Sequence, residues 1–192
     1  MTLEFSSFPK MARLSREMIV TEKIDGTNAQ VLICKKEEAQ PEFILAEKDG
    51  MAMLAGSRSR YLTVHGDNFG FAMWVVTNQE SIWKLGEGRH FGEWWGRGIQ
   101  RGYGVDDRRF SLFNTSRWNN ETKPECCLFV PTLYTGPFSV EECDEILRDL
   151  ETAGSVAAPG FMRPEGIIAF HVAANIGFKK TLGGDGAKGE AR

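Results

Sequence analysis

The sequence predicts one domain of mixed α and β structure, either α/β or α+β. Its 192 residues suffice for one substantial hydrophobic core and are few for two. Hydrophobic residues make up 42%, charged residues 26% and aromatic residues 11%, which is typical of a globular protein. Short β-prone runs that end at turn residues recur along the chain, and a few segments show helical periodicity. We therefore expect sheets with helices packed against them.

The first 17 residues predict a lead-in helix, and two strands follow it. Apolar residues recur there at roughly helical spacing: Phe5, Phe8, Met11 and Leu14. Met18–Val20 is a β-prone run that the turn pair Asp25-Gly26 ends, and Ala29–Cys34 is a second run with alternating faces. We expect these strands to be neighbours across the turn. Lys23 is then either a solvated lysine of a surface hairpin or a lysine that points into whatever the sheet encloses.

The next segment predicts a strand and then a polar loop. Phe43–Glu47 reads as the strand, which Lys48-Asp49-Gly50 closes with a turn. In the loop, Arg58 and Arg60 stand at alternate positions, so an extended chain places both on one face. Two guanidiniums so placed suit a phosphate, and an exposed loop is the other interpretation.

Two helices and one more strand are predicted further along the chain. Asp67 can cap a helix with an apolar stripe at Phe69, Ala72, Met73 and Val76. Cys126–Val130 predicts a buried strand that Pro131 ends. Ser139 and Glu142 form a capping box before a helix that Gly154 stops. The apolar face of that helix is expected at Val140, Cys143, Leu147 and Leu150.

Composition limits the classes of function. No apolar run approaches the roughly 20 residues needed to span a bilayer, and the N-terminus lacks the basic region and apolar core of a signal peptide. We therefore expect a cytoplasmic protein without a membrane partner. The four cysteines show no Cys-x-x-Cys spacing, which argues against zinc and against a disulfide framework. We interpret them as reduced core residues: Cys34, Cys126, Cys127 and Cys143.

A nucleic-acid function would require a local basic patch, because the net charge of −3 gives no global attraction. One candidate lies between Arg97 and Lys123. Basic residues outnumber acidic ones there, and aromatic residues are interleaved with them. By charge count alone, a solvated loop would look the same.

Thr21–Asn28 carries the most specific pattern, Thr-Glu-Lys-Ile-Asp-Gly-Thr-Asn. With each residue type near ~5–7% of usage, its six fixed identities recur by chance at roughly one position in ten million. The stretch resembles motif I of the covalent nucleotidyltransferases, the superfamily of polynucleotide ligases and mRNA capping enzymes. Segments resembling the later motifs follow in the family's order: Phe91–Gly96, Phe110–Asn114, Glu165–Phe170 and Ile176–Leu182.

This resemblance implies the fold and the domain organisation. It predicts an α+β, ATP-grasp-like nucleotidyltransferase (adenylation) domain of antiparallel sheets flanked by helices, over residues 1–182. Residues 183–192 are glycine-rich and polar, and we expect them to form a flexible tail. Nothing after the segment Ile176–Leu182, which resembles motif V of the family, corresponds to the OB-fold domain of DNA ligases. RNA affinity is then either poor or supplied by an accessory protein.

The resemblance also implies roles for the motif residues. Lys23 would attack the α-phosphorus of ATP, releasing pyrophosphate and leaving AMP on the lysine. Glu93 would bind the ribose hydroxyls, and Phe113 would stack on adenine. Glu165 would hold Mg²⁺ or Mn²⁺. Lys179 would reach the α-phosphate.

Further positions are expected to contact the nucleotide through the same resemblance. Arg58 occupies the place of a basic residue that touches the nucleotide or the 5′-phosphate. Glu22, Asp25 and Gly26 flank Lys23 within motif I and complete the expected cofactor-binding set.

The second lysine of motif V departs from the family pattern. The commonest form has two lysines separated by one residue, so that both face the same way. Lys179 and Lys180 are adjacent and must face opposite sides of a strand, so only one can enter the site. We expect it to be Lys179.

Asn28 helps to choose among the subfamilies. Gly-Thr-Asn resembles RNA ligases of the nick-sealing and RNA-editing type, where the matching asparagine is tied to the sealing step, and Trp94–Tyr103 resembles small phage-encoded RNA ligases. The expected function is therefore RNA repair by an ATP-dependent RNA ligase that joins 5′-phosphate and 3′-hydroxyl ends, acting on RNA ends or a nicked duplex. The alternatives are a small DNA ligase, an inactive adenylate- or RNA-binding module and, less favoured, a capping guanylyltransferase.

Overall fold

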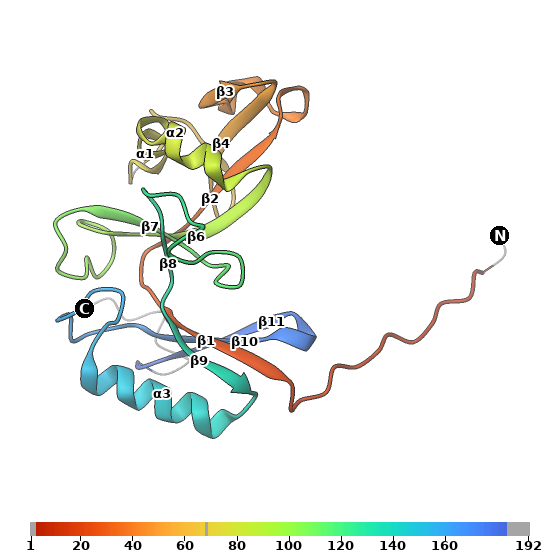
Figure 1. Cartoon of the computed structure of the whole chain (residues 1–192), viewed down its shortest axis with the longest axis vertical. Coiled ribbons are helices and arrows are strands. Elements are labelled where there is room, and N and C mark those ends of the chain that lie inside the picture. Colours follow the sequence, from red (N-terminus) through yellow and green to blue (C-terminus); the bar gives the residue numbers. More distant parts are fainter. Residues whose placement is uncertain (1–2, 68, 184–192) are drawn as a thin grey trace.

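The chain folds into two stacked β-sheets, each covered by helices on its outer side (Figure 1). The computed structural model describes residues 3–67 and 69–183. All strand pairs are antiparallel except β7 with β8. This arrangement confirms the α+β class. Across the described ranges, no helix is long and apolar enough to cross a membrane.

The smaller sheet has four strands in the order β11-β10-β1-β9, and α3 packs on it (Figure 1). The bounds are β1 Glu17–Lys23, β9 Thr132–Pro137, α3 Val140–Ala153, β10 Gly166–His171 and β11 Ile176–Thr181. Their core is made by Met18 and Val20 of β1, Ile167 and Ala169 of β10, and two helix residues, Cys143 and Leu150. Alternating burial along β1 matches a strand with one face on a core.

The larger sheet has seven strands, six of them in the order β3-β4-β2-β6-β7-β8, with β5 paired to β4. The bounds are β2 Thr27–Lys35, β3 Ala46–Lys48, β4 Met51–Ser57, β5 Tyr61–Leu62, β6 Gly88–Gly96, β7 Arg108–Leu112 and β8 Leu128–Phe129. Helices α1, Phe71–Thr77, and α2, Gln79–Ile82, pack on it. Short 3-10 turns lie at Lys36–Glu38, Pro41–Phe43, Trp83–Leu85 and Val172–Ala174.

The expected hairpin between the first two strands is wrong, because β1 and β2 belong to different sheets. β1 pairs with β9 and β10, whereas β2 pairs with β4 and β6. The segment Ile24–Gly26 instead carries the chain from one sheet to the other. Ile24 is buried there in a cluster with Trp95 and Tyr103. Alternating apolar residues predict a strand, but they do not determine which other strand it pairs with.

Three smaller expectations also differ from the structure. Residues 3–13 form no helix and extend away from the domain, because their apolar side chains find no surface to pack against (Figure 1). The strand expected at Phe43–Glu47 is short and shifted to β3, and β4, its partner across the predicted turn, was not expected. Helix α1 buries Phe71, Ala72 and Val75, so its apolar face differs from the expected one. Asp67 does accept a hydrogen bond from the Ala72 backbone N–H at 2.7 Å, as a cap would.

Helix α3 begins and ends where the sequence predicts. Ser139 is its N-cap, and its hydroxyl accepts from the Glu142 backbone N–H at 3.1 Å. Gly154 ends the helix with a positive φ of 84°. Cys143 and Leu150 face the core, and Val140 is exposed instead of buried.

This cap leads to a stability prediction. Ser139→Ala removes the acceptor of the Glu142 N–H, so we expect the free energy of unfolding to fall by about 1 kcal/mol. Urea unfolding followed by circular dichroism measures the change. Thr152→Ala is the matched control, because that hydroxyl only donates to the Arg148 carbonyl within the same helix. Equal stability of Ser139→Ala and wild type would contradict the capping role.

Candidate active site

A cavity of about 990 Å³ lies between the two sheets. One wall comes from β1, β10 and β11 through residues such as Ile19, Ile168 and Lys179. The opposite wall comes from β2 and β6 through Asn28, Phe91 and Glu93. The chain crosses between the sheets at the edge of this cavity. Side chains far apart in sequence therefore meet there.

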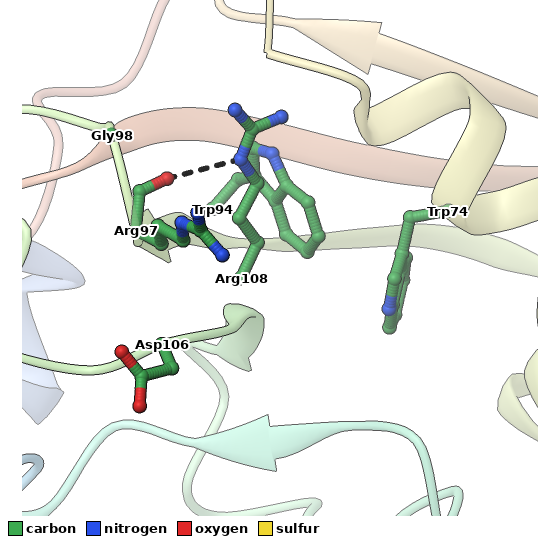
Figure 2. A pocket seen from close by; sticks show the side chains of 6 residues that line it. All are labelled: Trp74, Trp94, Arg97, Gly98, Asp106 and Arg108. Atoms are coloured by element: carbon green, nitrogen blue, oxygen red, sulfur yellow. Dashed lines mark hydrogen bonds between the residues drawn. The ribbon is translucent and has the colours of Figure 1, made fainter.

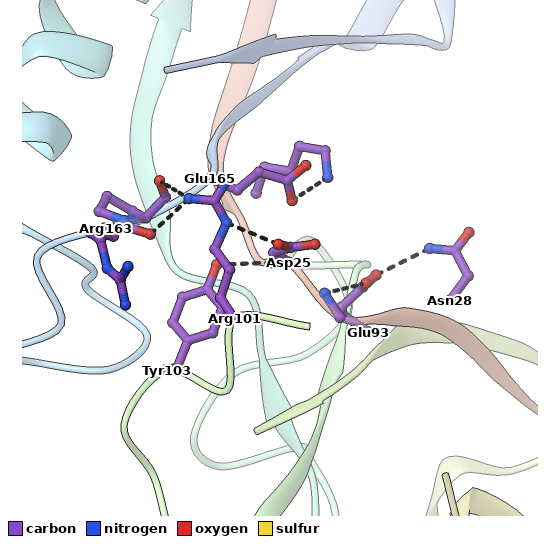
Figure 3. Close-up of polar contacts among 10 residues, drawn as sticks. Asp25, Asn28, Glu93, Arg101, Tyr103, Arg163 and Glu165 are labelled. Carbon is purple, nitrogen blue, oxygen red and sulfur yellow. Dashed lines mark hydrogen bonds and ion pairs between the residues drawn. The ribbon is translucent and has the colours of Figure 1, made fainter. Parts of the chain in front are cut away.

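Lys23 and Glu165 form an ion pair at the crossing. β1 runs antiparallel to β10 with Lys23 opposite Gly166, so the last residue of β1 meets the acid that precedes β10. The Lys23 Nζ donates to Glu165 Oε2 at 2.5 Å (Figure 3). The exposed fractions of the two side chains are 20% and 9%. The amine thus lies in the site, and the interpretation as a solvated hairpin lysine is wrong.

Arg101 fixes the backbone on both sides of this pair. Its Nε donates to Asp25 Oδ2 at 2.8 Å, and its Nη1 donates to the carbonyls of Arg163 and Pro164 (Figure 3). The Asp25 backbone N–H in turn donates to the Tyr103 hydroxyl at 2.8 Å, and burial raises the pKa of Tyr103. One guanidinium therefore links the segment after Lys23 to the segment before Glu165.

Glu93 is buried beside the crossing and holds it to β6. Its two oxygens accept from the Gly26 backbone N–H and from Asn28 Nδ2, each at 3.0 Å (Figure 3). Burial raises the pKa of Glu93 to about 7, although the Asn28 hydrogen bond and the positive charge of Lys23 oppose this shift. Each carboxylate oxygen has a second lone pair, so Glu93 can still accept from a ligand.

Gly26 is required by close packing at the same point. A Cβ there would lie 2.5 Å from the Trp94 carbonyl oxygen and 2.8 Å from the Trp95 Cβ. Neither Asp25 nor Gly26 lines the cavity itself. The structure thus places both residues in the support of the site, and the prediction that they bind the nucleotide stays a prediction.

The Glu22 carboxylate is engaged with the loop that follows α3. It accepts from the Ser155 hydroxyl at 2.5 Å and from the backbone N–H groups of Val156 and Ala157 at 2.8 Å. Glu22 is 1% exposed. Sequence reasoning missed this loop, because no local pattern connects residues 155–157 to motif I. The expected contact of Glu22 with the nucleotide stays a prediction.

Arg58 and Arg60 were expected to lie on one face, and the structure shows that they do not. Arg58 lines the cavity, and its Nε is 3.4 Å from Asn28 Oδ1. Arg60 donates instead to the Gly66 carbonyl at 2.9 Å. The chain bends after β4 ends at Ser57, so the alternation of an extended strand does not continue. Of these two arginines, Arg58 alone lines the cavity.

The adjacent lysines of β11 face opposite sides. Lys179 lines the cavity, and Lys180 pairs with Asp144 of α3. The expected choice of Lys179 thus agrees with its position. The role of Lys179 at the phosphate stays a prediction.

Two phenylalanines on the larger sheet line the cavity. Phe113 is 41% exposed, so it is not a buried core residue. Asn114 lines the cavity beside it. Phe91 is 52% exposed, and sequence reasoning missed it. Its position at i−2 from Glu93 was the available signal, because alternate residues of a strand share a face.

A divalent cation would find one suitable carboxylate here. Within residues 3–67 and 69–183, no three potential ligand side chains cluster as a metal site. Glu165 is nonetheless largely buried at the cavity edge, and only its Oε2 is paired with Lys23. Mg²⁺ is commonly held by one or two carboxylates together with water and substrate phosphates. The donor set fits a metal that arrives with the phosphates.

The basic patch of residues 97–123 is divided among several contacts. Arg109 pairs with Asp107, and Arg117 donates to the Leu85 carbonyl and lies over the Trp118 ring. Arg97 and Arg108 line a second cavity of about 630 Å³. Figure 2 shows Trp74 and Trp94 on its sides and Asp106 at its edge. The patch is therefore not one continuous surface.

Comparisons with known proteins place the chain among RNA ligases. The family model described as RNA ligase matches residues 16–176. The fold resembles a Naegleria gruberi RNA ligase variant solved with ATP and Mn, with a TM-score of 0.58 and 16% identity over 87% of this chain and 49% of that one. The same ligase solved with PPi gives a TM-score of 0.56 and 16% identity over 87% of this chain and 50% of that one. A variant solved with AMP and Mn gives a TM-score of 0.55 and 15% identity over 88% of this chain and 50% of that one.

The chain thus spans about half the length of the solved ligases it matches. No curated protein sequence matches it significantly. The structural likeness lies in the fold, since the identity is 16%.

The pKa of Glu93 predicts a pH dependence of stability. The ordinary pKa of a glutamate carboxyl is 4.5 and the pKa of Glu93 in the folded protein is about 7, so the folded protein holds one more proton than the unfolded chain between these pH values. Stability from this group is therefore fully present below about pH 4.5 and is lost as the pH rises to about 7.

Glu93→Gln should remove this part of the slope. Urea unfolding of wild type and variant across this pH range measures it, and the comparison uses the slopes, because the amide also alters the bonds to Gly26 and Asn28. If the free energy of unfolding changed with pH equally in the two proteins, burial would not raise the pKa of Glu93.

Proposed function

Because the chain belongs to the RNA ligase family, we propose that it is an ATP-dependent RNA ligase acting through AMP bound to Lys23. The observation that carries the proposal is the Lys23–Glu165 pair at the edge of a cavity built from two sheets. A binding module would need no nucleophile there. The proposed adenylation domain comprises residues 1–182. Of the expected tail at 183–192, residues 184–192 lie outside the described residues.

The first step joins the Lys23 amine to the α-phosphorus of ATP. A protonated amine has no free lone pair, so a proton must leave Nζ before the N–P bond forms. Glu165 Oε2, at 2.5 Å, is the acceptor in place. As the N–P bond forms, the bond to the bridging oxygen breaks, and pyrophosphate leaves with that electron pair.

The cavity residues would hold the nucleotide during this step. Glu93 is placed to accept from the ribose hydroxyls with its free lone pairs. Phe113 offers a half-exposed ring to adenine, and such stacking is typically worth about 1–3 kcal/mol per base. Lys179 and Arg58 supply positive charge for the phosphates.

Mg²⁺ or Mn²⁺ would be held by Glu165 together with the phosphates and water. When bound, the cation neutralises charge on the transferring phosphoryl group. The Naegleria ligase variants solved with ATP and Mn are consistent with this use of a metal.

The later steps would transfer AMP to a 5′-phosphate and then join a 3′-hydroxyl, releasing AMP. We assign Asn28 to the RNA end, since it lies between Glu93 and Arg58 at the cavity wall. We further propose that the substrate is an RNA end or nicked duplex. We also propose that an accessory protein contributes RNA affinity. A small phage-like ligase of this kind would act in cytoplasmic RNA repair, where ATP and RNA are available.

Covalent labelling tests the first step. With α-labelled ATP and Mg²⁺, wild type should acquire label, and Lys23→Ala should acquire none. Lys179→Ala should label about 100-fold more slowly, because it removes one positive charge from the transition state. Lys180→Ala is the matched control and should label within about twofold of wild type, since this lysine faces Asp144. Equal rates for the two lysine variants would contradict the assigned faces.

The sugar of the substrate separates an RNA ligase from a DNA ligase. We expect nicks with ribonucleotides on the 3′-hydroxyl side to be sealed and all-deoxyribonucleotide nicks to be sealed at least about tenfold more slowly, equivalent to about 1.4 kcal/mol. Gel separation of end-labelled strands measures both rates. Preferential sealing of the all-deoxyribonucleotide nick would favour the DNA ligase instead.

A further inference from the structure

The cavity has room for more than the nucleotide of the first step. Its volume of about 990 Å³ lies at the upper end of the range of about 300–1,000 Å³ for small-ligand sites. The roles proposed above for the first step use Lys23, Arg58, Glu93, Phe113, Glu165 and Lys179. A further part of the wall, contributed by Arg89 and Phe91 of β6, has no role in that scheme.

Phe91 lies beside the ring proposed to stack on adenine. The Phe113 backbone N–H donates to the Phe91 carbonyl at 3.0 Å, so the two residues are cross-strand neighbours at the end of β7. Side chains of such neighbours lie on the same face of a sheet, within reach of each other. Their exposed fractions are 52% for Phe91 and 41% for Phe113. The wall thus presents two adjacent aromatic rings, where adenine needs one.

Arg89 lies two residues before Phe91 and shares its face. Its Nη1 donates to Gln30 Oε1 at 3.1 Å and its Nη2 to the Tyr61 hydroxyl at 3.2 Å. Gln30 is itself fixed, because its Nε2 donates to the Ser57 carbonyl at 3.2 Å. The guanidinium is thereby oriented in advance by neutral acceptors.

The charge of Arg89 is not compensated by a carboxylate. Over the described part of the chain, no acidic side chain lies within ion-pair distance of it. A positive charge oriented by neutral groups at a cavity wall suits a phosphate. Residues two apart on a strand are separated by about 6–7 Å, which lets one nucleotide contact both.

We propose that Arg89 and Phe91 form a subsite for the terminal nucleotide of the RNA end, distinct from the AMP subsite. The base stacks on Phe91, and a backbone phosphate binds Arg89. The inference rests on the proposed ligase function, because it names where the substrate of the later steps binds. It places the RNA base next to the adenylate that will be transferred.

The test separates RNA binding from the reaction with ATP. Phe91→Ala and Arg89→Ala are compared with wild type in the dissociation constant for a short nicked RNA duplex bearing a 5′-phosphate, and in the KM for ATP in self-adenylylation. RNA binding should weaken about 5- to 150-fold for Phe91→Ala, the range expected from loss of one stacked base. The KM for ATP should stay within about twofold of wild type. Phe91→Tyr should bind RNA with an affinity close to that of wild type, because it keeps a ring on which the base can stack.

Matched controls lie outside the cavity. Phe178→Ala removes a ring of equal exposure, 51%, from β11, and Arg148→Ala removes an exposed arginine from α3. Neither should alter RNA binding. Since Phe91 and Arg89 are exposed, the variants should fold, and Phe91→Leu gives a second truncation that keeps apolar volume.

Several outcomes would overturn the subsite. One is RNA affinity of Phe91→Ala or Phe91→Leu equal to that of wild type. Another is a KM for ATP that rises in parallel with the RNA dissociation constant, which would assign these residues to ATP. If wild type acquires no AMP, the proposed function fails, and the RNA-binding comparison still decides the subsite because it requires no ATP.

Discussion

The structure depends on the meeting of Lys23 and Glu165 where the chain leaves one sheet for the other. An amine and a carboxylate at 2.5 Å with little exposure are stable only if both strands deliver them in register. Arg101 secures that register, because one guanidinium binds Asp25 and the carbonyls before Glu165. The Lys23–Glu165 pair thus lies between two neighbouring strands of the smaller sheet, beside the segment that carries the chain to the larger sheet, and Lys23 lines the cavity between the sheets.

Three glutamates near the crossing have different surroundings. Glu22 accepts three hydrogen bonds from the loop after α3 and is structural in this arrangement. Glu165 faces a positive charge and is placed to take a proton. Glu93 is buried with neutral donors, and its pKa of about 7 reflects that burial. In the proposed reaction, the environment and not the residue type would make Glu22 a support, Glu165 a proton acceptor and Glu93 a ligand contact.

Local patterns predicted the elements better than their pairing. The N-cap at Ser139 and the opposite orientations of Lys179 and Lys180 followed from residue type and spacing, because caps and strand faces are local properties. The hairpin at Asp25-Gly26 failed, because the partners of a strand are set by burial between distant segments. The contacts of Glu22 and Arg101 join residues far apart in sequence, and no short pattern encodes them.

The proposed reaction requires that the nucleophile is the Lys23 amine and no other lysine of the chain. The most direct measurement is the position of AMP after incubation with ATP and a divalent cation, mapped by mass spectrometry of peptides prepared near neutral pH. We expect AMP on Nζ of Lys23, with the peptides that contain Lys179 and Lys180 unmodified. AMP on another lysine, with the Lys23 peptide unmodified, would contradict it.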